Sequence, residues 1–204
     1  MPTSLLAVLS GAAFGLSLIV AIGAQNVFVL RQGLRRSHVL AVVLVCAVSD
    51  VVLITAGVAG LGGLLDRAPG VAAVARVAGA VFLTGYAVLA ARRALRPVQV
   101  EELDTAGSGS RRAAVLTALA LTWLNPHVYL DTVLLLGSVA VSHGDLRWWF
   151  GLGATTASVV WFAALGFGAR LVAPLFAKPG AWRVLDGAIA VVMLAIAVGL
   201  LAGI

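Results

Sequence analysis

The chain has 204 residues, of which 62% are apolar and only 11% are charged. An ordinary soluble domain is about 45–50% apolar and about 25% charged, and a chain of this length cannot hide so much apolar surface inside one core. Together with a mean hydropathy of +1.09, this composition excludes a water-soluble globule, a disordered chain and a disulfide scaffold. Lipid is therefore the expected solvent for most of the chain.

Six apolar stretches are long enough to cross a bilayer, since about 20 mostly apolar residues span its hydrocarbon layer. We expect membrane-spanning helices over residues 4–30, 38–65, 70–91, 113–141, 148–170 and 184–204. The first stretch has neither a basic leader nor a small-residue cleavage site before a soluble domain, so it is interpreted as a retained span and not as a signal peptide. The expected fold class is an all-α polytopic membrane protein.

The basic residues predict how these spans are oriented. Eleven of the 14 arginines and lysines fall in the first, third and fifth connections. By the positive-inside rule these connections are cytoplasmic and both termini lie outside, so the net charge of +6 is explained by topology and not by nucleic-acid binding. One alternative keeps the same loops inside. If the first segment enters the membrane and turns back at its polar break, the chain has five full spans and a cytoplasmic N-terminus.

A polar linker at residues 96–112 divides the chain into an N-terminal repeat (1–95) and a C-terminal repeat (113–204), each with three expected spans. Because three is odd, the halves must have opposite orientations in the membrane. The first span of each half carries a polar interruption, GAQN at 23–26 and LNPH at 124–127. Paired interruptions of this kind are typical of inverted-repeat transporters with a midplane site. We therefore expect six transmembrane helices arranged as two inverted three-helix repeats with broken first helices.

Two acidic residues lie within expected membrane-spanning helices, where a charged side chain is energetically unfavourable. Asp50 lies in the middle of the second expected span and Asp131 lies within the fourth. Each costs about 2.5–3.5 kcal/mol at the centre of an inserted helix, which favours a use in cation binding or proton relay. The alternative is that each carboxylate satisfies a Ser, Thr or backbone group, or pairs with a distant arginine such as Arg76.

The fourth expected span has polar groups on two faces. At 100° per residue, Thr122, Asn125, Tyr129 and Thr132 share one face, and His127, Asp131 and Ser138 share nearly the opposite one. Either a regular helix is enclosed by protein on both sides, or Pro126 breaks it and brings these groups together. We favour the break, which would let freed carbonyls line a cavity. In the first span, Gly23 would allow the backbone to deviate, and Gln25 and Asn26 offer uncharged amide donors and acceptors.

These residues favour secondary transport of a small cationic or zwitterionic solute. Two carboxylates in a low dielectric without a basic neighbour attract a cation or a proton, and amides with exposed half-helix ends suit an amino-acid head group. No hydrolytic, P-loop or dinucleotide motif is present, and only Ser138 near His127 or Asp131 is arguable as a nucleophile, so we expect no enzyme. The single cysteine, Cys46, is interpreted as a packing residue, and no metal site or cofactor is expected.

Several strings closely resemble the LysE (lysine/arginine exporter) family, in its basic-amino-acid branch. They are GAQNVFVLRQGLRR at 23–36, Asp50 within VSDVVLITAG, and LTWLNPHVYLDTVLLLGS at 121–138. The similarity covers the whole chain, including its length, its six apolar segments and its central polar linker. The resemblance gives Asn26, Asp50 and Asp131 as the residues that matter for transport.

The resemblance also implies a function and a location. The protein would export L-lysine or L-arginine from the bacterial cytoplasm, through the inner membrane, driven by the membrane potential and the proton gradient. Its partners would be the basic amino acid, protons and the bilayer. A homo-oligomer stays open because no motif marks one. The nearest alternative is an exporter of another small solute: a neutral amino acid, a diamine or a metal cation.

Overall fold

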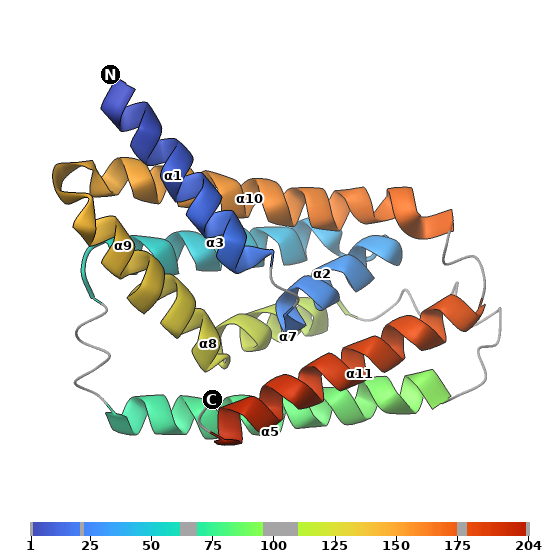
Figure 1. Cartoon of the computed structure of the whole chain (residues 1–204). Helices are drawn as coiled ribbons and strands as arrows, with labels where there is room; N and C mark the ends of the chain where they lie inside the picture. The colour runs from blue at the N-terminus through green and yellow to red at the C-terminus, as the bar shows by residue number, and fades with distance from the viewer. Residues whose placement is uncertain (1, 21–22, 62–68, 96–109, 175–178, 203–204) are drawn as a thin grey trace.

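The computed structural model describes residues 2–20, 23–61, 69–95, 110–174 and 179–202, and every regular element within these ranges is a helix (Figure 1). In chain order the longer helices are α1 (Pro2–Ile19), α2 (Ala24–Leu34), α3 (Val39–Val58), α5 (Pro69–Leu95), α7 (Arg111–Trp123), α10 (Arg147–Val172) and α11 (Pro179–Ala202). Between α7 and α10 lie the short α8 (Pro126–Val128), the π-helix η1 (Tyr129–Leu135), α9 (Leu136–Ser142) and the 3₁₀-helix η2 (Gly144–Leu146). The expected all-α fold class is confirmed.

The helices divide into straight spans and bent pairs. Within the described residues, four stretches are long and apolar enough to cross a membrane, namely Val39–Val58, Val77–Leu95, Gly144–Val172 and Gly180–Ala202. Two helix pairs pass the same test only when taken together: Thr3–Ile19 with Ala24–Leu34, bent by 85°, and Arg111–Trp123 with Pro126–Ser142, bent by 59° (Figure 1). The described residues thus provide four spans, or up to six if each bent pair is one span.

Two element ends differ from the sequence prediction. The second span was expected to reach residue 65, but α3 ends at Val58 because Gly60 has a φ of 87° and closes a helix C-cap, with Gly60 N donating to Gly57 O. The linker was expected to extend to residue 112, but α7 begins at Arg111, where the Ser110 side chain accepts a hydrogen bond from Ala113 N at 3.1 Å. Residues 96–109 of the linker lie outside the described residues.

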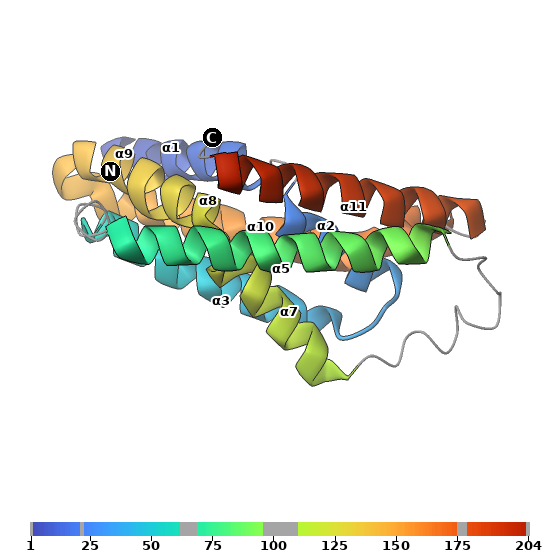
Figure 2. The same cartoon turned by 90° about the horizontal axis from the view of Figure 1, so that it is seen from below.

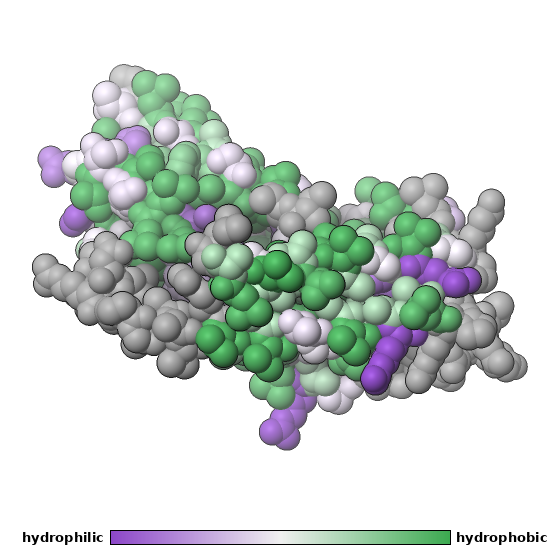
Figure 3. Space-filling model, turned by 60° about the horizontal axis from the view of Figure 1, so that its bottom comes forward, coloured by the Kyte–Doolittle hydropathy of each residue, from purple (hydrophilic) through white to green (hydrophobic). Residues whose placement is uncertain are grey.

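The outer surface fits a lipid environment. Many large apolar side chains are exposed, and Val81 and Val191 are each 69% exposed. Figure 3 shows hydrophobic atoms over most of the described surface of one face, with hydrophilic atoms mainly toward its ends and lower edge. A soluble monomer rarely exposes so much contiguous apolar area. The chain is therefore a polytopic membrane protein.

The helices pack in pairs drawn from different halves of the chain. α1 crosses α10, α3 lies against α7, η1 and α9, and α2 lies against α10. α5 and α11 run alongside one another (Figure 2). The larger buried apolar cluster joins these pairs through small residues and a few large ones, such as Phe28, Leu121 and Phe162.

The α1–α10 crossing depends on glycines. A Cβ on Gly153 would overlap the carbonyl oxygen of Val8, and a Cβ on Gly11 would overlap that of Phe150. Gly15, four residues after Gly11, brings the backbone close to Ala154, where a Cβ would lie 3.1 Å from Cα. Small residues of this kind let membrane helices approach closely, which matters because lipid provides no hydrophobic drive between them.

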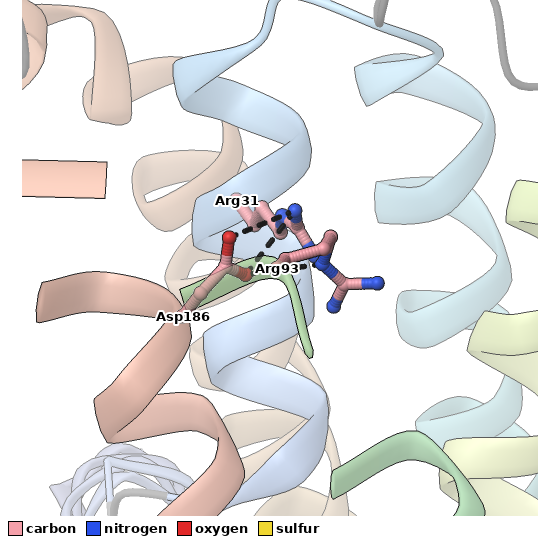
Figure 4. A network of polar contacts seen from close by, with 3 residues as sticks. All are labelled: Arg31, Arg93 and Asp186. Carbon is pink, nitrogen blue, oxygen red and sulfur yellow. Dashed lines mark hydrogen bonds and ion pairs between the residues drawn. The ribbon is translucent and has the colours of Figure 1, made fainter. Parts of the chain in front are cut away.

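A buried ion cluster joins three helices on the side of the bundle that carries the α2–α3 turn (Figure 4). Arg31 of α2 lies 3.2 Å from Asp186 of α11, and Arg93 Nε of α5 lies 3.3 Å from the same carboxylate. Arg31 is 4% exposed and Asp186 is 5% exposed. Arg93 also lies over the ring of Tyr86 at 5.7 Å. The sequence analysis missed Asp186 as a functional or structural acid.

The glycine contacts predict a matched pair of outcomes on α10. Gly153→Ala should destabilise the protein by about 1–3 kcal/mol or more, because the added methyl group overpacks a helix crossing. Gly168→Ala on the same helix has open space around it and should leave the stability unchanged or raise it, since Ala favours helix. Thermal unfolding of detergent-purified variants measures both. Equal melting temperatures for the two variants would contradict the proposed close approach.

The ion cluster predicts a second loss of stability. Asp186→Asn leaves Arg31 buried without its counter-charge, which costs about 3–5 kcal/mol and lowers Tm by about 6 °C or more. Asp145→Asn, on the exposed η2 turn, serves as the control and should leave Tm unchanged. The additional variant Arg31→Met with Asp186→Leu removes both charges and should recover most of the loss. A Tm for Asp186→Asn equal to that of the control would show that the cluster does not stabilise the fold.

Candidate functional site

A cavity of about 330 Å³ lies between the two helix breaks. Its size falls within the range of ligand-binding pockets. Seven of the nine residues predicted from the sequence line it: Gly23, Gln25, Asn26, Asp50, Asn125, His127 and Asp131. Both halves of the chain therefore contribute polar side chains to one cavity. The other two predicted residues, Pro126 and Tyr129, are not among the lining residues and act on the break itself.

The first break is held by an asparagine. α1 ends at Ile19 and α2 begins at Ala24. Asn26 Nδ2 donates to the carbonyl oxygen of Ile19 at 2.6 Å, and Asn26 Oδ1 accepts from Trp161 Nε1 at 3.3 Å. The side chain of Asn26 thus satisfies a backbone group that the broken helix leaves without a helical partner.

The backbone leaves the helix at Gly23, where a deviation was expected. Its φ of −116° and ψ of 169° are extended values that any residue adopts, so this conformation does not require glycine. Gly23 also forms part of the cavity wall.

The second break follows from Pro126, so the prediction of a broken fourth span is confirmed over a regular helix. A residue before proline avoids helical torsions, and Asn125 has a φ of −96° and a ψ of 105°. Its side chain accepts a hydrogen bond from His127 N at 3.2 Å and caps the new helix. The Tyr129 hydroxyl donates to the carbonyl oxygen of Trp123 at 2.8 Å. Tyr129 thus plays the part in this break that Asn26 plays in the first.

The polar groups of this span converge only in part. Asn125, His127, Asp131 and Thr132 line the cavity. Thr122 is buried and donates to Ala118 O at 3.0 Å, and Ser138 is exposed and donates to Leu135 O at 2.8 Å. The carbonyl of Trp123 is bonded to Tyr129, so it is not a free cavity ligand.

Asp131 lies in a π-helix, η1, that the sequence pattern did not predict. π-helical turns are rare and frequently occur at functional sites. This one packs against α3, where a Cβ on Gly57 would lie 2.7 Å from Thr132 O and a Cβ on Gly137 would lie 2.7 Å from Gly57 O. The close approach places the Asp131 turn beside the helix that carries Asp50.

The two acids have different surroundings. Asp50 is 6% exposed, and its Oδ2 accepts a hydrogen bond of 2.6 Å from the hydroxyl of Ser158 on α10, which is fully buried. Asp131 is half-buried, and no hydrogen bond joins its carboxylate to another described residue. The alternative given in the sequence analysis, that the carboxylate satisfies a serine hydroxyl, therefore holds for Asp50. The side chain of Arg76 lies outside the described residues.

The cavity offers no strong cation of its own. No arginine or lysine of the described chain lines it, and among the described residues His127 and Asp131 form no ion pair within 4.0 Å. One donor, Nε2 of Gln25, is buried and makes no well-formed hydrogen bond within the described chain, and the Gln25 side chain lies beside the Cys46 thiol. Cys46 is buried in the larger apolar cluster, as a packing residue would be. The cavity therefore combines uncompensated carboxylates with an unsatisfied amide donor.

Comparison with known proteins agrees with this picture. The family model described as LysE type translocator matches residues 16–203. A lysine exporter LysE of Corynebacterium efficiens is 38% identical over 220 residues, covering 94% of this chain and 96% of that protein. An arginine exporter protein ArgO of Serratia proteamaculans is 45% identical over 197 residues and covers 94% of each chain.

A protein of Mycobacterium tuberculosis (strain ATCC 25618 / H37Rv), provisionally named an amino-acid transporter, is 52% identical over 183 residues, 90% of each chain. No solved structure matches the chain. The family model covers most of the chain, and the relatives match at well over 30% identity along nearly all of it. The broken spans, the two cavity acids and these similarities lead to one assignment: the chain belongs to the LysE family of translocators.

Proposed function

We propose that this protein exports the basic amino acids L-arginine or L-lysine across the bacterial inner membrane in exchange for protons. The observation that carries the proposal is that Asp50 and Asp131 line one cavity, while no arginine or lysine of the described chain lines it. A cargo with an extra positive charge supplies the missing partner. The printed names of two relatives, a lysine exporter and an arginine exporter, favour the same cargo.

The uncharged groups suit the other end of such a cargo. Nε2 of Gln25 is buried and makes no well-formed hydrogen bond in the described chain, and an unmade hydrogen bond at a buried donor is costly. Because Gln25 lines the cavity, rotation of its side chain would bring this donor to the α-carboxylate of an amino acid. Asn125 also lines the cavity and adds a further amide. Arginine and lysine carry both a carboxylate and a side-chain cation, so one molecule can satisfy both kinds of group.

The packing supports two inverted repeats, each with a broken first span. In the first half, α1 and α2 both lie against α10 of the second half. In the second half, their counterparts α7, η1 and α9 lie against α3 of the first half. The third spans, α5 and α11, pack on one another (Figure 2). Asp50 and Ser158 are the twelfth residues of α3 and α10, the middle spans of the two halves. Halves related in this way can open a shared site alternately to either side of a membrane.

The same geometry favours a carrier over an enzyme. Ser138, the hydroxyl that the sequence placed near His127 or Asp131, is exposed and bonded to Leu135 O. Among the described residues no three metal-ligating side chains gather, which disfavours a metal cation as cargo. A neutral amino acid brings a single positive charge, its α-ammonium group, to a cavity lined by two acids. A diamine has no carboxylate for the amide donors.

Transport in proteoliposomes tests the proposal. Vesicles are loaded with radiolabelled arginine, lysine, threonine or putrescine, and the outer medium is made more acidic. We expect the wild-type protein to release arginine or lysine in preference to the others. Asp50→Asn and Asp131→Asn should each reduce this efflux about tenfold or more, since removing one partner of a buried charge pair costs about 2 kcal/mol or more and 1.4 kcal/mol is tenfold.

Asp145→Asn is the matched control, because it removes a carboxylate from the exposed η2 turn outside the cavity. It should transport as the wild type does. Unchanged arginine and lysine efflux in both cavity variants would show that the acids are not the site. Preferential release of threonine or putrescine by the wild type would show that the cargo is a neutral amino acid or a diamine, and not arginine or lysine.

A further inference from the structure

The two cavity acids differ in the hydrogen bonds that their carboxylates already make. Asp50 sits on α3 with its Oδ2 bonded to the Ser158 hydroxyl at 2.6 Å, and both residues are almost or fully excluded from the surface. Asp131 sits on η1, is half-buried, and accepts no hydrogen bond from another described residue. A cargo cation can reach Asp131 without displacing anything in the described chain. At Asp50, one of the two carboxylate oxygens already accepts a hydrogen bond from a buried hydroxyl.

A serine hydroxyl is a suitable partner for an acid that gains and loses a proton. It donates to an ionised carboxylate, and after rotation it accepts from a protonated carboxyl group. Asp50 therefore keeps a hydrogen-bond partner in both protonation states, although it lies at a depth where an unpartnered polar group is costly. An alanine at position 158 would remove the partner in both states.

Asp50 and Asp131 are the two carboxylates that line the cavity in the described chain. On the helices packed against α3, the arginines stand in terminal turns or at caps: Arg31, Arg35, Arg111, Arg112, Arg147 and Arg170. At the level of the cavity, α2 contributes Gln25, α10 contributes Ser158, and α8 and η1 contribute His127 and Asp131. Cys46 lies one turn before Asp50 on α3 itself.

Exchange requires cargo and proton to oppose one another, and two acids that line one cavity can do this through their charges. When Asp131 is vacant and ionised, its negative charge favours a proton on Asp50. When the cation of the cargo is bound at Asp131, the two charges cancel and the proton on Asp50 is released more readily. Binding of the cargo and binding of the proton therefore oppose one another, as exchange requires, and the opposition is reciprocal.

We propose that the two acids divide the work of transport: Asp131 binds the positive charge of the cargo, and Asp50, positioned by Ser158, carries the exchanged proton. This inference rests on the proposed function and deepens it. Ser158 is a positioning residue, since it acts through Asp50 and does not line the cavity.

Two assays on the same proteoliposomes separate these roles. The first measures exchange of unlabelled internal arginine for labelled external arginine without a pH gradient, which needs the cargo site and no net proton movement. The second measures arginine efflux driven by a pH gradient. Asp131→Asn should lose both activities about tenfold or more. Asp50→Asn should lose driven efflux by a similar factor and keep exchange within about twofold of the wild type.

Ser158→Ala should behave like a milder Asp50→Asn, with driven efflux reduced about tenfold and exchange kept. Ser158→Thr retains the hydroxyl and should restore driven efflux. Thr156→Ala is the matched control on α10, because Thr156 is exposed and bonded only within its own helix, to Leu152 O at 2.8 Å. It should match the wild type in both assays. If Ser158→Ala does not fold, Ser158→Cys, a weak donor of similar size, makes the same comparison.

The outcomes distinguish a failure of the proposed division of roles from a failure of the proposed export function. A wild-type protein that moves neither arginine nor lysine in either assay would overturn the proposed function, and the division of roles with it. Wild-type transport of arginine, with exchange and driven efflux lost together in Asp50→Asn, would overturn only the division of roles. Driven efflux in Ser158→Ala equal to that of Thr156→Ala would remove Ser158 from the mechanism.

Discussion

A backbone group that loses its helical partner inside a bilayer must find another within the protein, because no water is there to replace it. This constraint organises the structure. The α1–α2 pair and the α7–α8 pair are each broken, and side chains just beyond each break satisfy the freed carbonyls: Asn26 bonds Ile19 O, and Tyr129 bonds Trp123 O. The breaks are thus stable features of the fold, and the cavity between them is their consequence.

Charge is handled in two opposite ways within the same bundle. At one end, Asp186 lies between Arg31 and Arg93, so the buried acid is fully compensated by neighbouring cations. In the cavity, Asp50 has only a hydroxyl and Asp131 has no hydrogen-bonded partner in the described chain. Since both kinds of acid lie in a low-dielectric interior, the difference between them is informative. A compensated acid stabilises helix packing, and an uncompensated one is available to a cation from outside the protein.

The sequence predicted the features that depend on local pattern. Apolar length located the spans, Pro126 predicted the second break, and the cost of an acid in lipid singled out Asp50 and Asp131. It did not predict the contacts between distant segments. Ser158 and Asp50 are 108 residues apart, and Arg31 and Asp186 are 155 apart.

Asp186 was overlooked because it falls near the start of an apolar stretch, where an acid looks like part of a polar boundary. Only the packing of α11 against α5 and α2 shows that it is buried. The π-helix at Asp131 likewise depends on the approach of Gly57 and Gly137, which no local pattern records. The sequence does not indicate which acid a serine in an apolar helix will contact. The difference between Asp50, which is bonded to Ser158, and Asp131, which is not, could therefore be found only in the structure.

The contacts of α2 and the hydrogen bond between Asp50 and Ser158 limit how the cavity can rearrange. α2 is bonded at its cavity end through Asn26 to Ile19 and Trp161, and near its other end through Arg31 to Asp186. Breaking a buried ion pair by separating its partners costs several kcal/mol, so α2 should move together with α5 and α11 and not alone. The Asp50–Ser158 bond, by contrast, joins α3 to α10 at the cavity and changes character when Asp50 takes up a proton. The contact that responds to the proton is therefore the one between the middle spans of the two halves, where a change of state alters how the halves meet.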